Sequence, residues 1–97
     1  MNKSTINELE VISKKIENNT ATIEDYKRYE YLLQSGGLSH DYIYSYLIRA
    51  GFNSWEDFIA ARKKKENNDK EASLVGAIIG LGLGLLLIAM LGSNSKK

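Results

Sequence analysis

His40 is the only histidine in the chain, and Asp41 follows it directly. A histidine beside a carboxylate can act as a general base or as part of a metal site. The chain has no second histidine and no cysteine to complete such a site. The predicted position of His40, in the first turn of a helix, is typical of a surface residue. We therefore predict no catalytic residue, no metal site and no cofactor, and the chain is not expected to be an enzyme.

A helix, a glycine-containing turn and a second helix are predicted across residues 39–62, as in helix-turn-helix DNA-binding proteins. The second helix would begin with Glu56 and Asp57, which repel the phosphates that a recognition helix must approach. The net charge of the whole chain is only +1. We therefore expect no nucleic-acid partner, and a membrane-tethered transcription regulator is our weakest hypothesis.

Tyrosine is concentrated in one part of the chain, with six copies between positions 26 and 46. Tyrosine is amphipathic and enriched in protein interfaces. Tyr26 and Tyr29 share the apolar side of one predicted helix, so both should face a core. The other tyrosines are predicted to form a surface for a protein partner, the alternative being half-buried core residues. They are Tyr31, Tyr42, Tyr44 and Tyr46.

The run from Leu74 to Leu91 contains no charged side chain and none that needs a hydrogen bond. Its 18 residues would form a helix roughly 27 Å long. Residues 72–92 would reach about the 30 Å of a bilayer's hydrocarbon core. The N-terminus lacks the apolar core of a signal peptide. We predict a single transmembrane helix over residues 72–92, in the arrangement of a tail-anchored protein.

Two other structures compete with a membrane span for this run. A helix buried in a protein core is usually shorter, and the other 79 residues (97 minus 18) are too few and too polar to cover it. Glycine and leucine alternate over residues 80–85, which also fits a β segment. A lone strand in lipid would leave its backbone groups unpaired, so that structure would require a self-assembling, amyloid-like array of many chains.

Small residues recur along one side of the predicted span and form what we term the glycine face. Such stripes let membrane helices approach closely and associate. We therefore predict self-association or pairing with another span, although glycine is also simply common in membrane helices. Gly82 lies on nearly the opposite side and could serve a second interface. The glycine face consists of Ser73, Gly76, Ala77, Gly80 and Gly84.

Basic residues concentrate just before the predicted span, where five stand against Lys96 and Lys97 after it. The positive-inside rule then places the N-terminus in the cytoplasm, and a bacterial inner membrane is favoured. The same cluster is placed to contact anionic lipid headgroups. Its members are Arg62, Lys63, Lys64, Lys65 and Lys70.

Four short helices are predicted before the span, from N-terminal caps and from apolar residues at helical spacing. Residues 42–48 also show the alternation of a strand, but the cap before them and Gly51 after them favour a helix. The predicted helices and their capping residues are 6–18 with Thr5, 23–35 with Thr22, 40–50 with Ser39 and 55–66 with Ser54.

The predicted fold class is all-α, with a small bundle of about four short helices followed by a single C-terminal transmembrane helix. The predicted parts are a cytoplasmic head (1–66), a juxtamembrane linker (67–71), the span (72–92) and a short polar tail (93–97). The leading hypothesis is a membrane adaptor or assembly subunit that binds a protein partner and self-associates through its span. The alternative is a holin-like or toxin-like protein that assembles into a membrane pore.

Overall fold

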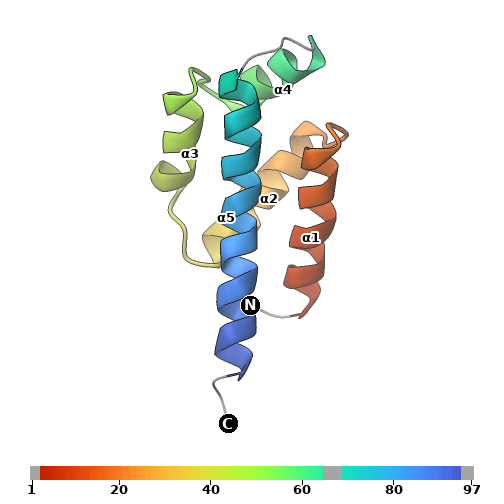
Figure 1. Cartoon of the computed structure of the whole chain (residues 1–97), viewed down its shortest axis with the longest axis vertical. Coiled ribbons are helices and arrows are strands. Elements are labelled where there is room, and N and C mark those ends of the chain that lie inside the picture. Colours follow the sequence, from red (N-terminus) through yellow and green to blue (C-terminus); the bar gives the residue numbers. More distant parts are fainter. Residues whose placement is uncertain (1–2, 65–68, 95–97) are drawn as a thin grey trace.

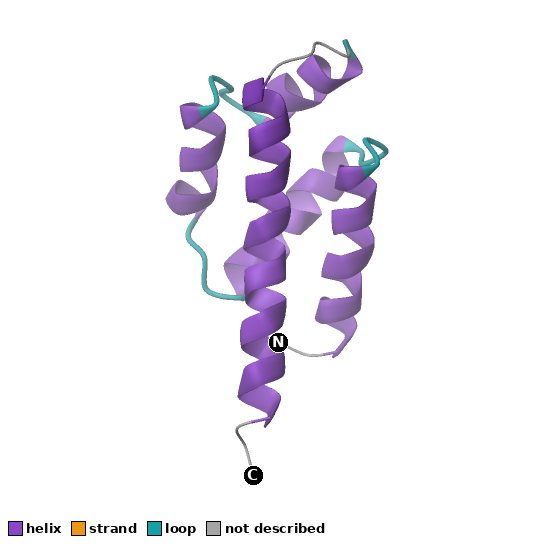
Figure 2. Ribbon diagram, viewed as in Figure 1, coloured by secondary structure: helices purple, strands orange, loops and turns teal. Residues whose placement is uncertain are grey.

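The computed structural model describes residues 3–64 and 69–94, with side chains for 3–64 and 72–88. Within these ranges the chain forms five helices and no strand, which confirms the all-α class (Figure 1 and Figure 2). None of the described helices is long and apolar enough to cross a bilayer. The helices are α1 (Lys3–Glu17), α2 (Ile23–Ser35), α3 (His40–Arg49), α4 (Trp55–Lys63) and α5 (Asp69–Asn94).

The longest helix, α5, runs through the middle of the molecule, with α1 on one side and α3 on the other (Figure 1). The helices α2 and α4 pass behind it in the same view. All four shorter helices contact α5. The C-terminal helix is therefore the element around which the head is assembled.

Side-chain caps begin three of the helices, as the sequence predicts. The hydroxyl of Thr22 accepts a hydrogen bond from the amide of Asp25, whose carboxylate accepts one from the Thr22 amide over 2.9 Å. The hydroxyls of Ser39 and Ser54 cap α3 and α4 in the same way, each over 3.1 Å. The first helix differs from its prediction: α1 begins at Lys3, so Thr5 lies inside its first turn.

The segment with the ambiguous pattern, residues 42–48, is helical. Its apolar residues Ile43 and Leu47 are four positions apart and both buried, whereas a strand would have placed them on one side together with residue 45. Gly51 follows with φ +93°, a left-handed conformation that ends the segment and that glycine adopts at no steric cost.

A single apolar core joins the four shorter helices to α5. Leu74 and Ile78 of α5 are 3% and 0% exposed, and they pack in the same cluster as Leu9 and Tyr29. A buried helix was not expected from the sequence, because the rest of the chain is too small and too polar to cover it on every side. In the structure the head covers only one side of α5, and four short helices are enough to cover that side.

The boundaries of the last two helices also differ from their predictions. The helix α4 ends at Lys63 rather than 66, and α5 begins at Asp69 rather than 72. Residues 69–71, predicted as part of the linker, are therefore helical, as are residues 93 and 94 of the predicted tail. The predicted linker residues 67 and 68 and the last tail residues, 95–97, lie outside the described residues.

Candidate functional site on the C-terminal helix

The inner side of α5 is held by Tyr29, whose side chain is fully buried. Its hydroxyl donates a hydrogen bond to the carbonyl oxygen of Ile78 over 2.9 Å and accepts one from the Ser13 hydroxyl at 3.5 Å. Burial raises the pKa of the Tyr29 phenol, so the hydroxyl stays protonated near neutral pH. Tyr29 therefore links α1, α2 and α5 at one point.

Gly82 allows this close approach of Tyr29 to α5. A Cβ atom on Gly82 would overlap the Tyr29 hydroxyl oxygen and would lie 3.0 Å from the ring carbon Cζ. Any side chain at position 82 would thus displace the tyrosine or the helix. The second interface that the sequence suggested for Gly82 corresponds, in this structure, to a contact with the head of the same chain.

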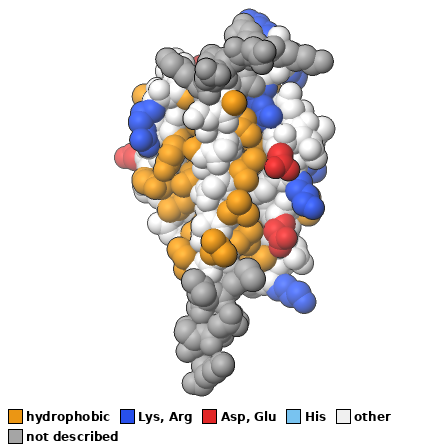
Figure 3. Space-filling view, in the orientation of Figure 1, with side chains coloured by type: hydrophobic (Ala, Val, Ile, Leu, Met, Phe, Trp, Pro, Cys, Tyr) orange, Lys and Arg blue, Asp and Glu red, His pale blue; other side chains and the backbone are white. Residues whose placement is uncertain are grey.

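The glycine face lies on the outside of the molecule. Gly76 and Gly80 are exposed and Gly84 is half-buried, and a Cβ on any of them would meet no atom within 4 Å. Ser73 is exposed and Ala77 is half-buried. Figure 3 shows a pale strip along α5 with hydrophobic side chains on both sides. The strip is open in a single copy of the chain, so association through it stays a prediction.

Large apolar side chains continue this outer surface toward the C-terminal end of α5. Leu83, Leu87 and Ile88 are 51%, 60% and 67% exposed. The described side chains of α5, residues 72–88, include no charged group. A contiguous apolar surface of this kind is typical of a contact with protein or membrane.

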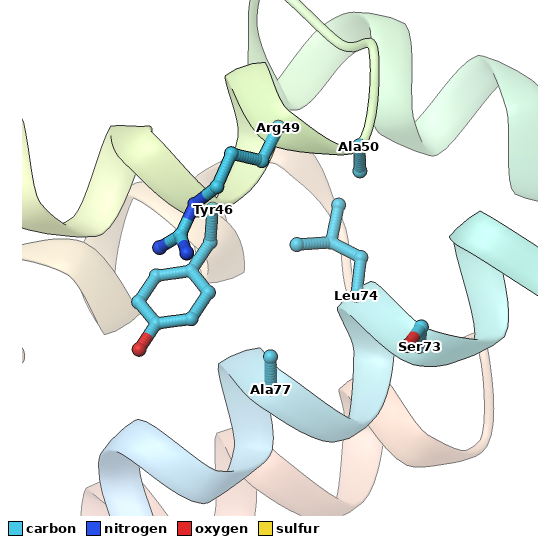
Figure 4. Close-up of a pocket in the computed structure, with 6 residues that line it drawn as sticks. All are labelled: Tyr46, Arg49, Ala50, Ser73, Leu74 and Ala77. Atoms are coloured by element: carbon cyan, nitrogen blue, oxygen red, sulfur yellow. The ribbon is translucent and has the colours of Figure 1, made fainter.

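A pocket of about 330 Å³ lies between α3 and the start of the glycine face (Figure 4). Tyr46 and Arg49 border it from α3, while Ser73, Leu74 and Ala77 border it from α5. The guanidinium of Arg49 lies 4.7 Å from the centroid of the Tyr46 ring, a cation–π contact. The structure thus brings together one predicted partner tyrosine and two residues of the glycine face.

The tyrosines predicted as a partner surface have different surroundings. Tyr31 is 57% exposed on α2. The hydroxyls of Tyr42 and Tyr46 lie 3.2 Å apart on α3, and this hydrogen bond raises the pKa of Tyr42. Tyr44 is half-buried and stacks on His40. Burial raises the pKa of the Tyr44 phenol. Tyr31 and Tyr42 are therefore exposed, whereas Tyr44 and Tyr46 are half-buried and pack against the core.

Glu30 joins three helices and was not singled out from the sequence. Its Oε1 accepts a hydrogen bond from Trp55 Nε1 over 3.0 Å, and its Oε2 lies 2.7 Å from Nδ1 of His40. A signal was available, because Glu30 lies four residues after Tyr26 and so shares its core-facing side. His40 thus packs against Glu30.

Among the described residues, no three His, Asp or Glu side chains gather into a possible metal site.

Arg62 is buried, unlike the described lysines of the basic cluster to which its position in the sequence assigned it. It is 8% exposed and donates hydrogen bonds to the carbonyl of Ile16 and, over 3.2 Å, to the hydroxyl of Tyr26. Lys63 and Lys64 are exposed. The remaining two cluster members, Lys65 and the side chain of Lys70, lie outside the described part. Arg62 therefore belongs to the core of the head.

Comparison with known proteins finds no match for this chain. No family model, no curated protein and no solved structure matches the chain.

Proposed function

We propose that the chain is a single-pass membrane protein that assembles through the glycine face of α5 and binds a protein partner through its head. The observation that carries this proposal is the outer surface of α5, where the glycines lie open and large apolar side chains are more than half exposed. Such a surface is unfavourable in water, whereas lipid or a second apolar helix accommodates it. The described part of α5 is not by itself long and apolar enough to cross a bilayer. In the sequence, however, the uncharged run continues to Leu91, and residues 72–92 would reach about the 30 Å of a bilayer core.

The proposed orientation has the head in the cytoplasm. Five basic residues stand just before the apolar run, within residues 62–70, and two follow it. This difference favours retention of the N-terminal side in the cytoplasm. Lys63 and Lys64 are exposed at the end of α4, close in sequence to the start of α5. Their ammonium groups are free to contact anionic headgroups, a role that the burial of Arg62 argues against for that residue.

The proposed partner surface centres on α3. Tyr42 is exposed there and Tyr46 is half-buried beside it, and Tyr31 on α2 is also exposed. Because Tyr46 borders the pocket beside Ser73 and Ala77, a protein that docks on α3 would also touch α5 while that helix is packed on the head. Partner binding and assembly would then be coupled, as an adaptor requires.

Assembly is tested by measuring the mass of the full chain, extracted from membranes in detergent, by light scattering. We expect a defined oligomer for the wild type and a shift toward monomer for Gly80→Leu. The space over Gly80 is open, so a larger side chain there does not disturb the fold of the head. Ile79→Leu is the control, because it alters the neighbouring residue and keeps the stripe. A monomeric wild type, or a chain that alkaline carbonate removes from membranes, would contradict the proposal.

A second candidate is a membrane-permeabilising effector. The observation in its favour is that a folded head covers one side of an apolar helix, as suits a protein that carries such a helix to a membrane. The described side chains of α5 offer only Ser73 as a polar group to line a channel, which argues against a well-hydrated pore. Leakage from dye-filled vesicles, abolished by Gly80→Leu, would favour the pore; an intact dye signal would favour the adaptor.

A further inference from the structure

The geometry points to a latch: the contact of Tyr29 with Gly82 and Ile78 holds α5 against the head and must open before α5 enters a bilayer. This inference rests on the proposed membrane function and adds a regulated step to it. The latch contains one hydrogen bond, from the Tyr29 hydroxyl to the Ile78 carbonyl, and one steric fit, of the tyrosine over Gly82.

Packing on the head and insertion into lipid exclude each other. The inner side of α5 is covered by the other helices, and Leu74 and Ile78 are almost fully buried there. Charged residues of α1, among them Glu10 and Lys14, lie beside Ile79 of α5 in one shared pocket. Drawing these charges into a hydrocarbon core is strongly unfavourable. The helix must therefore leave the head in order to insert.

The latch is placed where it can set the balance between these two states. Most contacts of α5 with the head are apolar, and lipid replaces them with contacts that are equally apolar. The hydrogen bond from the Tyr29 hydroxyl to the Ile78 carbonyl differs, because hydrocarbon offers no group that replaces it. This hydrogen bond exists only while α5 is packed on the head. The fit of the tyrosine over Gly82 is likewise a property of the packed state alone. These few atoms therefore add a contribution that is specific to the packed state, beside the apolar contacts that the head loses when α5 leaves it.

Two alanine variants separate the latch from other effects. Gly82→Ala introduces a clash with Tyr29, whereas Gly80→Ala adds the same methyl group where no atom lies within 4 Å. Both raise helix propensity and apolarity equally, so these contributions cancel. We expect Gly82→Ala to bind vesicles of equal parts phosphatidylcholine and phosphatidylglycerol at about tenfold lower lipid concentration, as expected when an overpacked contact is relieved. Gly80→Ala should bind like the wild type. Flotation of the full chain measures both.

A second pair tests the hydrogen bond without a steric change. Tyr29→Phe removes the buried hydroxyl, and Tyr31→Phe removes an exposed one from the same helix. We expect vesicle binding to strengthen about threefold for Tyr29→Phe, a typical effect of one hydrogen bond, and to stay unchanged for Tyr31→Phe. In the Gly82→Ala background, Tyr29→Phe removes the closest clashing atom and should return binding toward the wild-type value. Such a rescue would show that the head of Gly82→Ala still folds.

The outcomes separate the latch from the function on which it rests. Binding that is equal for Gly82→Ala and Gly80→Ala, with no effect of Tyr29→Phe, would overturn the latch while leaving membrane association intact. A wild type and variants that all fail to bind vesicles would overturn the membrane function and the latch with it.

Discussion

The guanidinium of Arg62 and the hydroxyl of Tyr26 meet in the core of the head, where the arginine donates a hydrogen bond over 3.2 Å. Arg62 also donates to the carbonyl of Ile16 near the end of α1. One side chain thus connects α4 to both α1 and α2. Removing a buried, hydrogen-bonded group is costly because its partners lose a donor where water has little access.

Arg62→Met should therefore lower the free energy of unfolding by about 1–3 kcal/mol. Lys63→Met, one residue further on and exposed, should change it by less than about 0.5 kcal/mol. Urea unfolding of the full chain, followed by fluorescence of the single tryptophan, Trp55, measures both values. Equal changes in the free energy of unfolding for the two substitutions would mean that Arg62 contributes no more to stability than an exposed cation.

Glu30 provides a second test of the head. Glu30→Ala removes the acceptor of the Trp55 indole and the partner of His40, so it should destabilise the head by about 1–3 kcal/mol. It should also shift the emission of Trp55, because the indole loses its carboxylate neighbour. Glu10→Ala, at an exposed position of α1, is the control. Thermal unfolding and the emission maximum are the two measurements, and an unchanged emission maximum would argue against the carboxylate–indole contact.

The caps of α2, α3 and α4 could be predicted from the sequence because they depend on neighbours three residues apart. Thr22 and Asp25, for example, form reciprocal hydrogen bonds regardless of what packs against the helix. The same local logic placed Tyr26 and Tyr29 in the core. The prediction fails at the first helix, where α1 starts at Lys3 and not after Thr5, the residue that the capping-box pattern marked as its cap.

The docking of α5 on the head could not be predicted in the same way. An uncharged run of leucine and isoleucine is apolar enough for both a protein core and a membrane, so composition does not distinguish them. The distinction depends on Tyr29 meeting Ile78, 49 positions later in the chain, and on the missing side chain of Gly82. The burial of Arg62 is similar, because its partners Ile16 and Tyr26 lie 46 and 36 positions away.

The cap of α2 gives a third prediction. Thr22→Ala removes the hydroxyl that accepts from the Asp25 amide and should cost about 1 kcal/mol of unfolding free energy. Thr22→Ser keeps a hydroxyl in the same position and should retain most of the stability. Chemical unfolding of the two variants side by side makes the comparison. Similar losses in both would assign the effect to packing of the threonine methyl group.

The ion pair between Glu8 and Arg28 gives a prediction about pH. Arg28 donates to both carboxylate oxygens of Glu8, one over 2.9 Å, and this hydrogen bonding lowers the pKa of Glu8 below its usual 4.5. Because the folded-state pKa is lower than the unfolded one, the pair stabilises the fold fully above about pH 4.5. That contribution is lost as the pH falls through the folded-state pKa. The side chains of Arg28 and Glu8 are 50% and 35% exposed, so solvent screens the pair and the effect is small.

A double-mutant cycle with Glu8→Gln, Arg28→Gln and the combined variant isolates this contribution. The thermal midpoints should reveal favourable coupling at pH 7, and the coupling should disappear in acid once Glu8 is protonated in the folded state. Added salt at pH 7 should weaken it, since exposed charges are screened. A coupling that persists unchanged at low pH would mean that the two side chains interact through packing and not through charge.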